Sequence, residues 1–303
     1  MLMIVAPVLW SIAGVFTRHL ESARGFEVTF WRSVFAALFV GGALLWQERG
    51  RALAKVRAMG GIGVVSGFMW STMFCCFMIS LTMTTVANTL IVMSISPLLT
   101  AFLAWMVLGQ KIAGRTWFAI AVAFAGMTGM FASSMSAVDG RHLAGMLIGL
   151  GVPLASAINV IILKKAGHGV DLIPAVFLGG VLSSLMMLPL AWPFQASLHD
   201  IGILAILGVF QLGFPCMLMV RASRALSAPE IALLALLEVL LGPIWAWLGA
   251  GEVPTSATIV GGGIVLFALV FNELASMRRP AARGNGNGVG AAPALPVGES
   301  GGH

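Results

Sequence analysis

Charged side chains are scarce in this sequence. Asp, Glu, Lys and Arg together make up 9% of the 303 residues, whereas a soluble domain carries about 25%. Such a composition excludes an ordinary cytosolic enzyme, a disordered protein and a nucleic-acid-binding protein, so no nucleic acid partner is expected. The net charge of +6 is distributed between long apolar runs, which is typical of the loops of a membrane protein.

Cysteines and cofactor motifs are also few. Cys75, Cys76 and Cys216 all lie inside apolar runs, and this odd number gives neither a disulfide framework nor a CxxC metal pattern. The sequence contains no GxxxxGK[ST] phosphate loop and no HExxH motif, and its five histidines lie in expected loops or the tail. We therefore expect no cofactor, no metal site and no ATP hydrolysis.

Apolar residues fill long stretches of the chain. They make up 59% of it, and the mean hydropathy is +1.00. Because about 20 residues cross a bilayer as a helix, the sequence predicts an all-α polytopic membrane protein with ten transmembrane helices. The polar cluster of Thr82, Thr84 and Thr85 marks the turn between the third and fourth of them. The ten expected spans lie near residues 2–17, 29–46, 58–80, 86–108, 113–134, 142–163, 172–192, 201–220, 229–250 and 256–274.

Lys and Arg are distributed unequally between the two sets of loops. With these spans, 13 of the 17 basic residues fall on one side of the membrane. The positive-inside rule then places both termini in the cytoplasm. The segment 280–303 is rich in Gly, Ala, Pro and Asn, so we expect it to be a disordered tail.

The two halves of the chain, residues 1–135 and 140–275, show weak internal similarity. The segment PLLTAFLAWMVLGQ at 97–110 aligns with VLLGPIWAWLGAGE at 239–252. Each half holds five expected spans, and since five is odd, the second half must insert upside down. The sequence thus predicts two inverted five-helix repeats, an architecture in which transporters hold their substrate near the membrane midplane.

Several motifs carry a family resemblance. LWSIAGVFTR at 9–18, FWR at 30–32 and LEVLLGPIWAWLGAGEVPT at 237–255 resemble the EamA-like ten-helix branch of the drug/metabolite transporter superfamily. The resemblance implies alternating-access movement of small organic solutes, often export of amino acids, other metabolites or drugs. The sequence departs from the family pattern at Gln110, where the family has Glu, and at Val239, where it has Pro.

Glu238 is the main candidate for a functional side chain. It lies near the middle of the ninth expected span, where a carboxylate is expensive unless it faces a cavity or a partner. It would contact a substrate amine or act as a protonatable switch; the alternative is a neutral acid bonded to neighbouring helices. The other expected lining residues lie at similar depth: Trp10, Ser11, Trp70, Ser71, Ser96 and Gln211.

Each of these other residues also has a purely structural interpretation. Trp10 and Trp70 would stack on a ring or a cation, or simply pack in the helix bundle. The serines would contact the solute, or bond to their own or a neighbouring helix.

Three further residues are candidates for gating or anchoring. Pro97 and Pro243 are expected either to interrupt the fourth and ninth spans, because proline removes a helical hydrogen bond, or to be tolerated there as kinks. Arg32 is expected near the external end of the second span. Outward snorkelling as a membrane anchor is the favoured interpretation, and pairing with Glu27 as a gate is the alternative.

Together these features predict a secondary transporter, not an enzyme, that exports small organic metabolites such as amino acids across a bacterial inner membrane. Its expected partners are the solute and the lipid bilayer. Proton coupling and facilitated diffusion both fit the sequence, as do a monomer and a homodimer. The alternatives are a multidrug or organic-cation efflux protein, a non-transporting scaffold, and a membrane-embedded lipid-modifying enzyme. The enzyme is disfavoured because His, Asp and Cys do not cluster near one interface.

Overall fold

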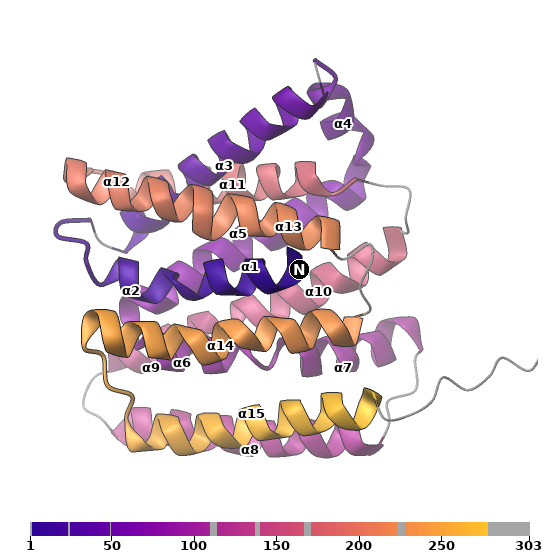
Figure 1. Cartoon of the computed structure of the whole chain (residues 1–303), viewed down its shortest axis with the longest axis vertical. Coiled ribbons are helices and arrows are strands. Elements are labelled where there is room, and N and C mark those ends of the chain that lie inside the picture. The colour runs from indigo at the N-terminus through magenta and orange to yellow at the C-terminus, as the bar shows by residue number, and fades with distance from the viewer. Residues whose placement is uncertain are drawn as a thin grey trace, which may run out of the picture.

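The structure is a computed structural model that describes residues 2–23, 25–48, 50–109, 114–136, 140–166, 171–222 and 228–277. Within these ranges every regular element is a helix and no strand occurs (Figure 1). The expected tail 280–303 lies outside them. The helices are α1 (Leu2–Ser11), α2 (Ala13–Thr17), α3 (Phe26–Glu48), α4 (Ala52–Ala58), α5 (Gly60–Met83), α6 (Val86–Met93), α7 (Ser96–Leu108), α8 (Gly114–Ser136), α9 (Gly140–Gly149), α10 (Gly151–Ala166), α11 (Ile173–Ala191), α12 (Leu198–Ile206), the π-helix η1 (Leu207–Gly213), α13 (Phe214–Ala222), α14 (Ala228–Ala250) and α15 (Ser256–Met277).

Six helical segments are long and apolar enough to cross a membrane. They are Phe26–Glu48, Gly60–Met83, Val86–Val107, Gly140–Ile162, Ile173–Ala191 and Leu198–Ala222. Shorter apolar helices occupy Ile4–Thr17, Trp117–Gly126, Leu237–Ala250 and Ile259–Ala268. The expected all-helical membrane protein is therefore confirmed at this level.

The expected turn at the threonine cluster is present. Helix α5 ends at Met83, and Thr85 begins α6 by accepting a hydrogen bond from the backbone N–H of Asn88 on its side chain. Such a cap satisfies one of the free amides at a helix start, which explains why an uncharged stretch reverses direction here.

Several apolar segments are interrupted. Helix α6 ends at Met93 and α7 begins at Ser96 with Pro97 in its first turn, so the expected break at Pro97 is confirmed. At Pro243 the alternative interpretation is confirmed, because α14 runs continuously from Ala228 to Ala250 with this proline inside it. A single proline removes only one helical hydrogen bond, and a packed membrane helix tolerates that loss.

Three interruptions had no signal in the sequence analysis. Ile12 separates α1 from α2, and Leu150 separates α9 from α10. The segment Leu207–Gly213 forms a π-helix between α12 and α13. π-Helical turns occur frequently at functional sites, and this one carries Gln211.

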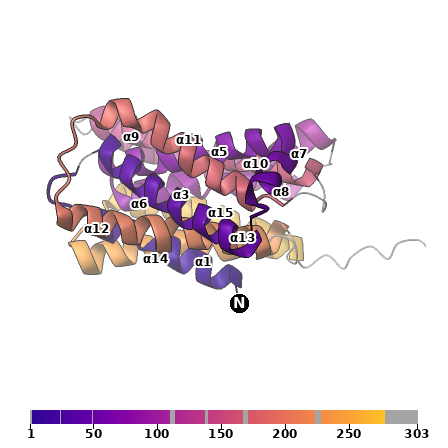
Figure 2. The ribbon, with the colours of Figure 1, turned by 90° about the horizontal axis from the view of Figure 1, so that it is seen from above.

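The helices pack as a layered bundle. Helix α3 lies between α11 on one side and the α12–η1–α13 segment on the other (Figure 2). Helices α8 and α15 form a separate pair at one edge (Figure 1). Glycines allow the closest approach: a Cβ at Gly208 of η1 would lie 2.6 Å from the backbone oxygen of Arg32 on α3.

Two buried acids hold together the loops at the end where α2 stops. Asp200 accepts hydrogen bonds from the backbone N–H groups of residues 21, 22 and 23 at 2.8 Å each. It also completes a capping box with Ser197 at the start of α12. Glu27 at the start of α3 accepts from the N–H groups of Gln195 and Ala196. Each acid thus accepts hydrogen bonds from backbone N–H groups of a neighbouring loop.

Candidate functional site

Arg32 lies at the centre of a buried polar group of side chains. It is fully buried on α3, its Nη1 donates to Oε1 of Gln211 at 2.9 Å, and its Nη2 donates to the backbone oxygen of Phe74 at 3.1 Å. The guanidinium also lies 5.6 Å from the centre of the Phe77 ring. Its Nε is buried and has no hydrogen-bond partner among the described residues. Such an unsatisfied charged donor is uncommon in folded proteins.

This position corrects the expectation for Arg32. Neither outward snorkelling nor pairing with Glu27 occurs, because Arg32 points into the bundle and the Glu27 carboxylate accepts from the loop amides and from the Trp31 indole. The physical reason is the hydrogen bond to Gln211, which lies 179 residues further along the chain and so could not be recognised as a partner in the sequence.

Gln211 connects Arg32 to the first helix. Its Nε2 donates to the backbone oxygen of Trp10 at 3.4 Å, close to the end of α1. Trp10 in turn lies against the core cluster that contains Cys216, and its side chain contacts that thiol. The structure therefore brings together two of the expected lining residues, Trp10 and Gln211, around Arg32.

Glu238 on α14 is a buried acidic side chain that interacts with this group. It is 8% exposed on α14 and interacts electrostatically with Arg32, without a direct hydrogen bond between the two. An acid on α14 and a guanidinium on α3 are thus both buried in the apolar bundle, and no hydrogen bond or ion pair joins them. In a low-dielectric interior this arrangement gives both groups a strong attraction for a ligand of the complementary charge.

The remaining expected lining residues are placed less centrally. Trp70 is buried against Phe74 in the contact between α5 and α11. The Ser71 hydroxyl donates to the sulfur of Met186, and the Ser11 hydroxyl donates to the Val8 oxygen. These bonds give the two hydroxyls structural partners; a role in solute binding stays a prediction.

Ser96 and Pro97 lie at the start of α7, and Pro243 lies in α14. Ser96 is half-buried at the start of α7, where its backbone oxygen accepts from the Thr100 hydroxyl. Pro97 follows it in the first turn, and Pro243 lies inside α14 one turn after Glu238. Their roles in binding or gating stay predictions.

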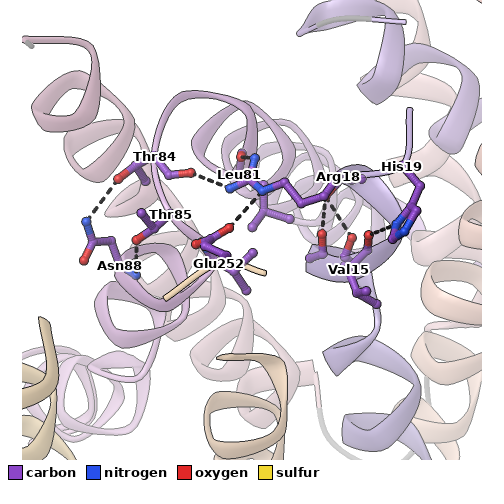
Figure 3. A network of polar contacts seen from close by, with 12 residues as sticks. Val15, Arg18, His19, Leu81, Thr84, Thr85, Asn88 and Glu252 are labelled. Atoms are coloured by element: carbon purple, nitrogen blue, oxygen red, sulfur yellow. Dashed lines mark hydrogen bonds and ion pairs between the residues drawn. The ribbon is translucent and has the colours of Figure 1, made fainter. Parts of the chain in front are cut away.

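A second polar network lies at the end of the molecule where α2 stops, and the sequence analysis did not identify it as functional (Figure 3). Arg18 Nε donates to Glu252 Oε2 at 2.9 Å, and its Nη1 and Nη2 donate to the backbone oxygens of Leu81 and Thr84 at 3.0 Å each. The other carboxylate oxygen of Glu252 accepts from the N–H of Val86 at 2.6 Å. The only sequence signal was the position of Glu252 directly after an apolar segment.

At the opposite end, α4 carries a smaller charged cluster. Lys55 donates to Glu48 and to Asp171, which precedes α11. These hydrogen bonds, first that to Glu48, raise the pKa of Lys55 above its ordinary value. Because the pairs are partly exposed, they hold the loops together only weakly.

One group of potential metal ligands occurs among the described residues. Ligand atoms of Glu21, His199 and Asp200 lie within 4.8 Å of one another. The oxygens of Asp200 already accept the backbone amides of residues 21 to 23, so its lone pairs are committed to the loop. This occupancy favours a structural role for the cluster.

Comparison with known proteins identifies the family. The EamA-like transporter family matches residues 1–132 and again residues 143–273. A solved crystal structure of another protein superposes with a TM-score of 0.67 at 15% sequence identity, covering 92% of this chain and 98% of that chain. That likeness shows a shared fold.

Characterised relatives are transporters. The pseudopaline exporter CntI of Pseudomonas aeruginosa is 25% identical over 249 residues, covering 80% of this chain and 84% of the relative. The S-adenosylmethionine uptake transporter of Rickettsia prowazekii is 23% identical over 264 residues, covering 86% and 87%. Human solute carrier family 35 member G1 is 23% identical over 282 residues, covering 88% and 75%. The chain belongs to the EamA-like transporter family, within the drug/metabolite transporter superfamily.

Proposed function

We propose that this protein is a secondary transporter that exports small organic metabolites such as amino acids across the bacterial inner membrane by alternating access. The observation that carries this proposal is the buried group of Arg32, Gln211 and Glu238 inside an apolar helical protein of a transporter family. Ionisable side chains inside a membrane are expensive and mark substrate or ion pathways. The proposed topology has ten membrane spans with both termini in the cytoplasm.

The pattern of helix packing supports two inverted five-helix repeats, residues 1–135 and 140–275. Three contacts join a helix to its counterpart in the other half: α3 with α11, α6 with α14 and α8 with α15. Several of the other contacts occur in exchanged pairs. Helix α5 packs on α11 and α10, and its expected counterpart, the α12–η1–α13 segment, packs on α3 and α1. Likewise, α1 packs on α14, and α10, its expected counterpart, packs on α7. A two-fold relation between the halves produces this exchange.

Broken helices support the same arrangement. The first apolar segment is interrupted at Ile12, and the segment that would be its counterpart in the second half is interrupted at Leu150. Breaks in corresponding helices are typical of transporter binding sites, because free backbone groups there contact the substrate or an ion.

The guanidinium of Arg32 and the acidic side chain of Glu238 favour a solute that carries both an acidic and an amine group. A zwitterion would place its carboxylate by Arg32 and its ammonium group by Glu238. An organic cation would meet repulsion from Arg32, which disfavours the efflux alternative. One relative is named for uptake of S-adenosylmethionine, which fits an amino-acid-like solute. Another is named as an exporter of pseudopaline, so the relatives differ in the direction of transport.

The test is flux of labelled amino acids, organic cations and nucleosides into proteoliposomes, with and without a pH gradient. We expect saturable flux of amino acids that falls at least about tenfold in Glu238→Gln, because removing the charge leaves the ammonium group without its counter-ion. Glu21→Gln, the same change in a carboxylate that is 64% exposed, is the matched control and should retain full flux.

The outcomes separate the alternatives. Flux that a pH gradient drives in the parent protein but not in Glu238→Gln would make this carboxylate the coupling group. Flux of organic cations alone would replace the proposal with the efflux alternative. No flux of any solute class, from protein shown to be folded, would contradict it.

A further inference from the structure

We propose that Arg18 and Glu252 form the latch of a gate at the end of the molecule opposite the start of α1 and the end of α15. The proposal rests on the proposed alternating-access function and adds which residues hold one end closed. The latch consists of the Arg18–Glu252 ion pair and the hydrogen bonds of these two side chains to the α5–α6 turn (Figure 3).

The latch joins three segments that are remote in the sequence. Arg18 follows α2, Leu81 and Thr84 lie at the end of α5, and Glu252 lies between α14 and α15. Arg18 bonds through all three of its nitrogens, and Glu252 bonds through both oxygens. A planar guanidinium suits such divided contacts. These bonds are all satisfied together only while the three segments meet.

Beneath the latch, helices α2, α6 and α14 touch without room for a side chain. A Cβ at Gly242 of α14 would lie 2.1 Å from Leu90 of α6. A Cβ at Gly14 of α2 would lie 2.6 Å from Val86 of α6, and a Cβ at Gly249 of α14 would lie 2.4 Å from Val15 of α2. Glycines permit this contact of backbone and side chain. The three helices therefore close this end directly below the ion pair.

The exposure of the pair makes it suitable for reversible opening. The side chains of Arg18 and Glu252 are 30% and 16% exposed, so water already reaches them. An ion pair at such a position contributes little net free energy, since water replaces its bonds when it separates. The latch can therefore hold the closed state without preventing its opening, in contrast to the hydrogen bonds of Asp200, which is fully buried.

The experiment measures access to a thiol below the latch. Cys75, Cys76 and Cys216 are replaced by alanine, and Leu90→Cys places a reporter thiol on α6 where α14 covers it. Protein in lipid nanodiscs is reacted with a polar maleimide, without any solute. We expect labelling to be at least about fivefold faster in Arg18→Gln and Glu252→Gln than in the parent. Glu21→Gln, at the same end of the molecule, is the control and should label at the parent rate.

Charge-retaining variants keep the test decisive if a neutral variant fails to fold. Arg18→Lys preserves the charge but loses the planar arrangement of donors, so we expect an intermediate labelling rate. Parent-like labelling of the reporter thiol in all folded latch variants would overturn the proposal.

A cross-link separates this proposal from the transport proposal. Arg18→Cys/Glu252→Cys, joined by a reducible bifunctional thiol reagent, should stop flux until a reducing agent is added. Undiminished flux through fully cross-linked protein would overturn the gate while leaving transport intact. Faster labelling of the reporter thiol in the latch variants, without flux in any protein including the parent, would instead support the latch and contradict the transporter.

Discussion

Arg32 is the residue whose environment most constrains the candidate site. Its guanidinium is fully buried in an apolar bundle, and its hydrogen bonds reach Gln211 and the backbone of α5. Burial desolvates this cation, and Glu238 on α14 interacts with it electrostatically. The three side chains form one unit, so the removal of any one changes the environment of the others.

We predict that Arg32→Met lowers the free energy of unfolding by about 2–4 kcal/mol. The substitution keeps most of the side-chain volume, but leaves Gln211 Oε1 without its donor and Glu238 without a cation. Thermal unfolding in detergent measures the change. The double variant Arg32→Met/Gln211→Met should recover part of the loss, because both members of the hydrogen bond are then apolar. A single variant as stable as the parent would show that the bonds of Arg32 contribute no net stability.

At the scale of elements, the π-helix η1 positions Gln211. Its wide turn lies against α3, where Gly208 approaches the Arg32 backbone oxygen and Phe35 so closely that a Cβ would lie 2.6 Å from each. Because this contact involves backbone, neither partner can move aside as the end of a flexible side chain would. The spacing of α3 and η1, and thus the Arg32–Gln211 bond, depends on this glycine.

Gly208→Ala should therefore destabilise the protein by about 1–3 kcal/mol through overpacking. Gly202→Ala on α12 is the matched control, since no atom lies within 4 Å of its added Cβ. There the substitution should be neutral or stabilising by up to about 1 kcal/mol, because alanine favours helix. Thermal unfolding of both variants in the same detergent checks the difference, and equal effects would contradict the proposed role of Gly208.

At the scale of the whole molecule, the helices run between two ends that the proposed topology places on opposite sides of the membrane. The N-terminus and the end of α15 lie toward one end in Figure 1, and α2 and the start of α12 lie toward the other. The ion pairs of Lys55 lie at the first end and the Arg18–Glu252 latch at the second. The proposed alternating-access mechanism requires that the two ends close at different times.

The sidedness is testable with two exposed positions. Leu198, at the start of α12, is 89% exposed, and Trp46, near the end of α3, is 81% exposed. In the background without native cysteines, we predict that an impermeant maleimide added to intact cells labels Leu198→Cys but not Trp46→Cys. Lysis should expose both thiols. Labelling of Trp46→Cys alone in intact cells would reverse the proposed orientation, and labelling of both would contradict it.

The sequence was informative about segments and less so about contacts. The threonine turn at 82–85 and the break at Pro97 were predicted correctly, since capping and proline chemistry act within a few residues. At Pro243 the sequence left a break and a tolerated kink open, and the helix continues through it. The π-helix and the breaks at Ile12 and Leu150 were not predicted, because packing against neighbouring helices decides where an apolar helix deviates.

Composition and order along the chain determined the class of protein: low charge and long apolar runs require a helical membrane protein, and the matched motifs indicate its family. Only the tertiary structure decided that Arg32 points inward to Gln211 and that Arg18 meets Glu252, 234 residues away. The physical reason is that lipid and protein interior are both apolar. Hydrophobic periodicity therefore does not reveal how each helix is rotated about its axis, and that rotation sets which side chains meet.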